Sequence, residues 1–167
     1  MNTDIIKIYD DFDKNKLNNF FDNLIQFVNK YESEFQKYTS LDYLKSIRRF
    51  KSQDFILGHS DDNLEAGIFF YKTKVEENRE DICNQVAALI WALSAYMIDE
   101  VCPVCSESNM RLTVIAGESD PIIKFCDECL YTGVDGKYVE IKEELIPASK
   151  NLVKSYLNMK YKTHGDI

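Results

Sequence analysis

Cys102-Pro-Val-Cys105 and Cys126-Asp-Glu-Cys129, two close cysteine pairs with twenty residues between them, decide how the C-terminal part of this chain folds. Pairs at this spacing are typical of a four-thiolate zinc site, in which two tight turns each supply two sulfurs to a tetrahedral ion. Four protein ligands leave no open coordination position for a water or a substrate. The sequence therefore predicts one structural zinc ion per chain. Its expected ligands are Cys102, Cys105, Cys126 and Cys129.

The residues between the two pairs favour zinc over an iron centre or a redox dithiol. Residues 110–116 and 122–125 have the composition of strands, and residues 117–121 contain the Gly and Pro of a turn. Two cysteine turns at the base of a hairpin form a zinc ribbon. A third strand is predicted at residues 138–141. Loss of any one ligand is expected to unfold the ribbon, because metal binding and folding share one free energy in small sites.

The chain before the first cysteine pair is predicted to be mainly helical. From Leu17 to Tyr38 apolar residues recur at alternating steps of four and three, which indicates an amphipathic helix. Further apolar residues, such as Phe20 and Phe27, widen the stripe, which favours packing on a globular core over a coiled-coil dimer. Ser40 is a candidate cap for a second, shorter helix.

Two apolar runs and a long apolar helix follow. Phe55-Ile-Leu57 and Ile68-Phe-Phe-Tyr71, separated by a polar loop, predict a β-hairpin within the helical part. The acidic residues between 76 and 81 then suit the first turns of a helix, which is almost uniformly apolar from Val86 onward. We expect this helix to run to about Glu100 and to place Trp91 inside the core.

The predicted fold class is α+β in three parts, packed as one compact unit. Residues 1–100 form a mainly helical region with the short hairpin, residues 101–146 form the zinc ribbon, and residues 147–167 form a C-terminal helix. Pro147 suits the first turn of that last helix. No Gly, Ser or Pro-rich spacer separates the helical region from the ribbon, so we expect the two to pack together.

The charge of the chain disfavours nucleic acid as a partner. Lys and Arg number 20 against 28 Asp and Glu, giving a net charge of −8. The segment from Glu100 to Glu144 contains ten acidic and four basic residues, and four thiolates with a divalent ion add a charge of about −2. Only Arg48, Arg49 and Lys51 offer a small basic face. A protein partner is therefore expected.

The sequence also predicts a cytoplasmic protein without a membrane span. Residues 1–7 show no basic segment followed by the apolar core of a secretory signal, and a reducing compartment suits cysteines that bind metal. The longest apolar stretch, residues 86–98, has thirteen residues, whereas spanning a bilayer takes about 20. We interpret it as part of a buried helix.

The remaining residues with chemical potential have ordinary explanations. Cys83 lies on the predicted buried helix, where a cysteine acts as a small apolar residue. Asp11-Phe-Asp13-Lys-Asn15 resembles the start of a calcium loop, but Lys16 stands where the loop needs glycine, so Asp13 is interpreted as a helix cap. The two histidines and one acidic pair are expected to be surface residues, and no catalytic residue is predicted. These four are His59, Asp61, Asp62 and His164.

The metal segment contains one more specific pattern. Val114-Ile-Ala-Gly-Glu-Ser119 is followed by Ile123-Lys-Phe-Cys-Asp-Glu-Cys129. With the first cysteine pair, these residues resemble the zinc-binding domain at the N-terminus of the ClpX unfoldase, over residues 102–130 only. The resemblance implies that all four cysteines bind zinc, and that the domain dimerises and recognises adaptors or substrates through its surface. The chain has no P-loop sequence, so the ATPase of that family is not expected.

Together these features favour a non-enzymatic protein whose zinc-stabilised surface binds another protein or a second copy of this chain. The alternative is an immunity protein that neutralises a bacterial toxin, such as a basic nuclease, through its acidic surface. A DNA-binding regulator and an enzyme are less favoured, because the chain lacks an extended basic face and a recognisable catalytic constellation.

Overall fold

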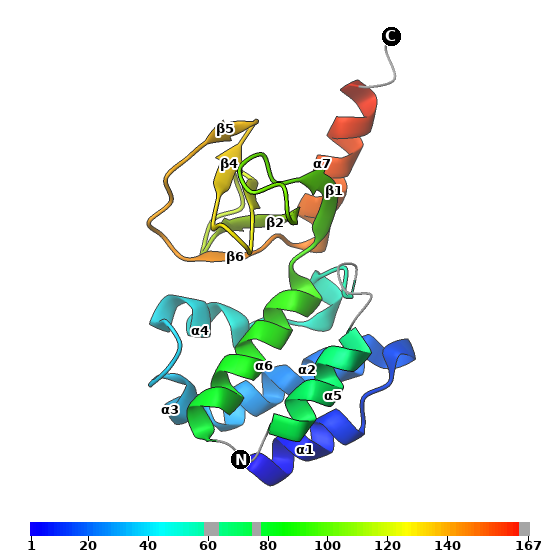
Figure 1. Ribbon diagram of the computed structural model, residues 1–167, viewed down its shortest axis with the longest axis vertical. Helices are drawn as coiled ribbons and strands as arrows, with labels where there is room; N and C mark the ends of the chain where they lie inside the picture. The colour runs from blue at the N-terminus through cyan, green and yellow to red at the C-terminus, as the bar shows by residue number, and fades with distance from the viewer. Residues whose placement is uncertain (59–63, 75–77, 164–167) are drawn as a thin grey trace.

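The protein has a helical half and a sheet half, joined by one long helix. The structure is a computed structural model that describes residues 1–58, 64–74 and 78–163. Its N-terminal helices gather at the bottom of Figure 1, and a six-stranded antiparallel sheet lies above them with the C-terminal helix at its side. The predicted α+β class is confirmed.

The helical half contains six α-helices and two short 3-10 turns within the described residues. The helices are α1 (Asn2–Asp10), α2 (Leu17–Lys30), α3 (Glu32–Phe35), α4 (Leu41–Ile47), α5 (Leu64–Lys74) and α6 (Arg79–Ser94). The 3-10 turns are η1 (Lys14–Lys16) and η2 (Ser52–Asp54).

The first helices follow the predicted apolar pattern and caps. The amphipathic segment from Leu17 breaks at Tyr31, whose φ of −112° and ψ of 28° leave the helical region, so it forms α2 and α3. The Ser40 hydroxyl accepts the N–H of Tyr43 at 3.2 Å and caps α4, as predicted. The Asp13 carboxylate accepts the N–H of Asn15 at 2.9 Å and caps only the short turn η1.

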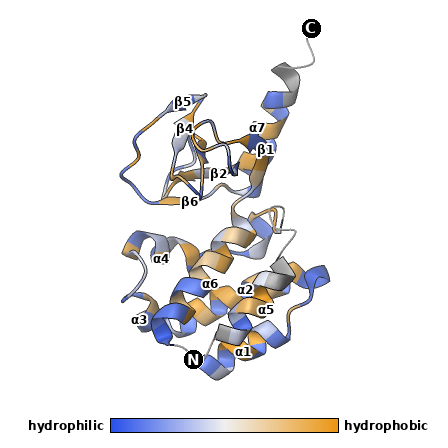
Figure 2. Cartoon of the chain, viewed as in Figure 1, coloured by the Kyte–Doolittle hydropathy of each residue, from blue (hydrophilic) through white to orange (hydrophobic). Residues whose placement is uncertain are grey.

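The first core lies between α2 and α6. The apolar side of α2 is completely buried at Phe21, Leu24 and Val28, and it meets the buried side of α6, which includes Ile82 and Val86. Figure 2 shows apolar residues along both helices. Each large side chain buried in this way contributes about 1.5–3 kcal/mol. The apolar stripe of α2 therefore packs on the core of this chain, as the sequence predicts.

The predicted β-hairpin in the helical half is wrong. Residues 68–71 belong to α5, and residues 55–57 follow the turn η2 without forming a strand. Ile68 is 4% exposed and Tyr71 packs against the same core, whereas Phe69 is 69% exposed. The three-residue step between Ile68 and Tyr71 is the helical one, so packing on the core overrides the β-forming composition of the run.

The long helix α6 is shorter than predicted. It begins at Arg79, where the Asn78 side chain accepts the N–H of Asp81 at 2.8 Å, and it ends at Ser94 instead of about Glu100. At Ala95 the chain becomes extended, with φ of −79° and ψ of 100°, and a strand follows. Pairing with the sheet therefore ends the helix. Residues 76 and 77, predicted to start it, lie outside the described residues.

The sheet has the order β1-β2-β3-β4-β5, and β6 pairs with the C-terminal part of β2. Its strands are β1 (Met97–Val101), β2 (Asn109–Ile115), β3 (Ile123–Phe125), β4 (Thr132–Val134), β5 (Lys137–Tyr138) and β6 (Leu145–Pro147). The predicted hairpin of residues 110–116 and 122–125 is confirmed as β2 and β3. The strand predicted at residues 138–141 is present only as the end of β5.

The sequence predicts Pro147 in the first turn of the last helix, and this prediction is wrong. Pro147 is the last residue of β6. The next residue, Ala148, donates its N–H to Leu112 O at 3.0 Å, so the chain stays attached to β2 beyond the proline. The helix α7 then runs over Lys150–Thr163. Its buried residue Val153 packs into a second core with Ile98 and Leu112, on one face of the sheet.

Candidate metal centre

The fold brings the four predicted ligands together from two connections of the sheet. Cys102 and Cys105 lie between β1 and β2, and Cys126 and Cys129 lie between β3 and β4. Their four sulfur atoms all lie within 4.8 Å of one another. Two contacts join the two pairs, with 3.5 Å between the sulfurs of Cys102 and Cys129 and 3.7 Å between those of Cys105 and Cys126. Each pair forms a tight turn, here called a knuckle.

The two knuckles share a backbone hydrogen bond and a left-handed residue at the same position. The N–H of Ser106 donates to Cys102 O at 3.1 Å, and the N–H of Leu130 donates to Cys126 O at 3.0 Å. Ser106 and Leu130 have φ values of 59° and 58°, in the left-handed region. The same turn, four residues after the first cysteine of each pair, therefore aims both pairs of sulfurs at a common point.

The left-handed positions carry residues that do not favour that conformation. A non-glycine residue in the left-handed region loses roughly 1–2 kcal/mol, because its Cβ approaches the following carbonyl oxygen. Leu130 is also 69% exposed, so its side chain gains little from burial. Turn geometry alone does not account for a leucine at this place.

The environment of the sulfurs suits thiolate ligands. Burial raises the pKa of the Cys102 thiol, but backbone N–H groups of Cys105 and Val104 outweigh it and lower the pKa to about 6. The N–H of Val104 lies 3.5 Å from this sulfur. Burial raises the pKa of Cys126 to about 12, since a second thiolate there would be a buried charge beside the first. A cation among the four sulfurs removes this repulsion.

The centre is half inside the protein. Cys102 and Cys126 are 1% and 0% exposed and belong to the second core, whereas Cys129 lies at the surface. All four ligand positions are protein sulfurs, so the arrangement is suited to holding a metal ion and not to binding a substrate at it. A metal ion here would tie the connection after β1 to the connection after β3.

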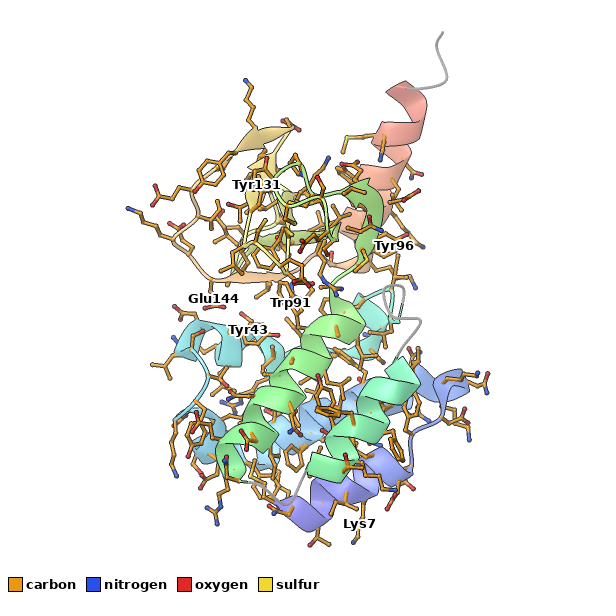
Figure 3. The ribbon with its side chains drawn as sticks, in the orientation of Figure 1. Lys7, Tyr43, Trp91, Tyr96, Tyr131 and Glu144 are labelled. Carbon is orange, nitrogen blue, oxygen red and sulfur yellow. The ribbon has the colours of Figure 1, made fainter. Side chains whose placement is uncertain are left out.

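An acidic residue inside the second knuckle connects the centre to α6. Asp127 accepts a hydrogen bond from the indole N–H of Trp91 at 3.0 Å. Its other oxygen pairs with Arg111 of β2, whose guanidinium also donates to Ala95 O at 2.9 Å. Arg111 is 8% exposed, so this is a largely buried charge with its partners in place. Trp91 is half-buried at the junction of the two halves (Figure 3), not inside the helical core.

Sequence reasoning did not identify Asp127 and Arg111. Two signals were available: an arginine within an otherwise apolar strand, and a carboxylate between two metal ligands. A charged residue in a buried strand implies an opposite charge nearby. The sequence does not give the identity of that partner, because it depends on how the knuckle folds back.

A second ion cluster fixes α7 beside the first knuckle. Glu100, the penultimate residue of β1, pairs with Lys124 of β3 and with Lys160 of α7, the latter at 2.6 Å. The hydroxyl of Tyr156 lies 3.4 Å from the same carboxylate. These contacts hold α7 against the edge of the sheet near the metal centre.

Other predicted residues have structural roles or fall outside the described part of the chain. Cys83 is completely buried in the first core, and burial raises its pKa to about 11, in line with an unreactive thiol. Arg48, from the predicted basic face, pairs with Glu32 and donates to the Asn29 side chain at 2.9 Å. The residues that the structure does not describe are His59, Asp61, Asp62 and His164.

Over residues 1–58, 64–74 and 78–163, no helix combines the length and the apolar content that crossing a bilayer requires.

The comparisons with known proteins leave the family open. No protein-family model, no curated protein and no solved structure matches this chain.

Proposed function

We propose that the four cysteines bind one zinc ion and that the ribbon so stabilised binds another protein through the surface around its knuckles. The resemblance of residues 102–130 to the ClpX-type zinc-binding domain supports both parts. In this proposal the protein is cytoplasmic and has no catalytic activity of its own.

The sulfur positions support zinc. With Zn–S bonds of about 2.3 Å, the edges of a tetrahedral four-sulfur site measure about 3.8 Å. The sulfur separations across the two pairs, 3.5 and 3.7 Å, lie near that length, and all four sulfurs lie within 4.8 Å of one another. A disulfide would need a separation of about 2.05 Å, so the sulfurs are arranged as ligands and not as bonded pairs.

Three exposed apolar side chains flank the ligands and form what we call the knuckle patch. Val101, Val104 and Leu130 are 58%, 65% and 69% exposed. Each is adjacent in sequence to one of the four cysteines, so all three lie at the metal end of the sheet. Single exposed apolar residues are common on soluble proteins, whereas several at one site suggest an interaction surface.

Leu130 is the observation that carries the proposal. It combines an unfavourable φ of 58° with 69% exposure, so both its backbone and its side chain reduce stability. Glycine is the residue that this turn favours. Strain of this kind persists where another requirement outweighs it, and it concentrates at functional sites. Binding of an apolar surface on a partner protein is such a requirement.

The charge around the knuckle patch favours a basic partner. The segment from Glu100 to Glu144 carries a net charge of −6 before the metal is counted. Acidic and basic surfaces steer one another together and set specificity. An immunity protein that neutralises a basic toxin remains the alternative form of this proposal, since it needs the same acidic, apolar surface.

Metal analysis of the purified protein tests the first part. We expect one zinc per chain, retained through gel filtration and released when the four cysteines are alkylated or replaced. Iron in place of zinc, or a metal-free protein of unchanged thermal stability, contradicts the zinc assignment.

Affinity capture with matched variants tests the second part. We expect wild-type protein to retain a basic partner that Leu130→Gly loses, while the zinc content and melting temperature of this variant stay at least as high. Leu41→Ser is the control, because Leu41 is 59% exposed on α4, in the helical half. If Leu130→Gly captures the same proteins as the wild type, the knuckle patch is not the binding surface.

A further inference from the structure

A pocket of about 390 Å³ lies where the helical half meets the sheet. Its walls come from four elements that are distant in sequence: Tyr43 from α4, Trp91 from α6, Phe125 from β3 and Glu144, which directly precedes β6. Figure 3 shows Tyr43, Trp91 and Glu144 together at this junction. The volume is within the range of about 300–1,000 Å³ in which proteins bind small ligands.

Three aromatic rings line the pocket at steep angles to one another. The Trp91 ring lies 5.7 Å from that of Phe125 with an interplanar angle of 89°, and 6.5 Å from that of Tyr43 with an angle of 63°. Rings that stand nearly perpendicular present π faces in different directions. The faces of tryptophan, tyrosine and phenylalanine attract cations within about 6 Å.

Two polar groups at the pocket are suited to a hydrogen-bond donor. The hydroxyl of Tyr43 is buried, and no hydrogen-bond partner for it exists among the described residues. The carboxylate of Glu144 accepts the hydroxyl of Ser40 at 2.6 Å, which leaves its remaining lone pairs for another donor. Burial, followed by the nearby Glu144 charge, raises the pKa of Tyr43 and keeps its hydroxyl neutral.

Basic side chains of the described residues share a groove with Glu144 but do not form an ion pair with it. Lys45 and Arg49 line a neighbouring groove that also reaches Glu144, and Lys45 pairs with Asp42 at 3.0 Å. Among the described residues, no lysine or arginine forms an ion pair with Glu144. The indole N–H of Trp91 is taken by Asp127, so the ring contributes its face and not its donor.

We propose that this pocket binds a primary alkylammonium group, the chemistry shared by a lysine side chain and a free aliphatic amine. The ammonium donates to the Tyr43 oxygen and to the Glu144 carboxylate, and the aromatic faces stabilise its charge. The alkyl stem lies against Trp91, Phe125 and Leu145. A neutral apolar ligand leaves the buried Tyr43 hydroxyl without a partner, which is unfavourable for a buried polar group, and does not compensate the charge of the half-buried Glu144. The inference does not depend on the knuckle patch.

Trp91 makes the proposal directly measurable, because it is the only tryptophan of the chain and it lines the pocket. Titration with butylammonium chloride is expected to change its fluorescence in a saturable way. Butanol has the same stem without the charge, and sodium chloride supplies the ionic strength alone. Equal binding of butanol, or no saturation with butylammonium, overturns the proposal.

Two variants and two controls locate the binding. Glu144→Gln keeps the bond from Ser40 but loses the charge, so its affinity is expected to fall by about tenfold. Tyr43→Phe removes only a hydroxyl that lacks a partner, so it is expected to fold normally and to bind about threefold to tenfold more weakly. Glu143→Gln and Tyr38→Phe change exposed residues that do not line the pocket, so both variants should keep wild-type affinity. Wild-type affinity in Glu144→Gln overturns the proposal.

Two further ligands separate the sources of the ammonium group. Nα-acetyl-lysine methylamide represents a lysine side chain of a protein, and 1,5-diaminopentane represents a free aliphatic amine. Tighter binding of the lysine derivative assigns the pocket to a protein ligand, and tighter binding of the diamine assigns it to a small amine. Failure of both to displace butylammonium contradicts the proposal, whereas the zinc and capture experiments above are unaffected by either result.

Discussion

The indole N–H of Trp91 donates a hydrogen bond to Asp127 Oδ1 at 3.0 Å, and this bond joins α6 to the second knuckle. Asp127 directly follows the ligand Cys126, and its other oxygen pairs with Arg111 of β2. One carboxylate therefore fixes the knuckle against the sheet and against the helical half. Because the bond ends at the only tryptophan, the state of the metal centre should be visible in the fluorescence of α6.

We expect Asp127→Ala to lower the free energy of unfolding by about 2–3 kcal/mol, because it leaves the buried charge of Arg111 without its partner. The side chains of Arg111 and Asp127 are 10% and 29% exposed, which places the effect below that of a fully buried pair. Urea unfolding at saturating zinc measures it. Glu128→Ala, in the same knuckle but exposed, should change stability by less than about 0.5 kcal/mol. Equal effects of the two variants contradict the anchoring role of Asp127.

Thiol counting should separate the metal ligands from the fifth cysteine. In the folded, zinc-loaded protein we expect all five thiols to react slowly with an aromatic disulfide reagent. A chelator should release zinc and make four thiols reactive, while Cys83 should react only in denaturant, because it is completely buried. Cys83→Ala is the matched control and should keep its zinc. Reaction of fewer than four thiols after chelation argues against the four-sulfur site.

Much of the metal centre could be predicted from the sequence because its determinants are local. The cysteine spacing fixes both knuckles, and the turn residues between β2 and β3 bring them to the same end of a hairpin. The Asp127 contacts could not be predicted in this way. They join residues 16 and 36 positions apart, so they depend on how the sheet is placed against α6.

The two wrong predictions in the helical half, the β-hairpin and the end of α6, also result from contacts between residues that are distant in sequence. The run from Ile68 to Tyr71 has strand composition. In a helix, however, these two residues lie on the same side, and both pack on the first core. The predicted end of α6 lies too far along the chain, because residues 95–98 continue the apolar run of the helix. Only the pairing of β1 with β2 distinguishes strand from helix there, and no local pattern encodes that pairing.

Ser106→Gly should stabilise the first knuckle or leave it unchanged. Ser106 has a φ of 59°, and relief of roughly 1–2 kcal/mol of strain is partly offset by about 0.5–1 kcal/mol of extra chain entropy. The expected net gain in the free energy of unfolding is about 0.5 kcal/mol. Thermal unfolding at fixed zinc concentration measures it. Ser108→Gly, in the same loop but without a positive φ, is the control and should not stabilise the protein.

The burial of Cys83 should make stability depend on pH in the alkaline range. Its pKa is raised from 9.0 to about 11 in the folded protein, first by burial and then by the charge of Glu34. The unfolded chain therefore loses this proton at a lower pH than the folded chain. The contribution is constant below pH 9.0 and decreases as pH rises from there toward about 11.

Cys83→Ala isolates this contribution from the tyrosines and zinc ligands that titrate in the same range. The free energy of unfolding of the wild type minus that of Cys83→Ala should be constant from pH 7 to about 8.5. At higher pH this difference should decrease, because only the wild type loses stability through the Cys83 thiol. Above about pH 11 the difference should become constant again, since both states of the wild type are then ionised. Urea unfolding at half-unit pH intervals measures it. A difference that does not change with pH means that the Cys83 thiol titrates alike in both states, which contradicts its placement in a closed apolar core.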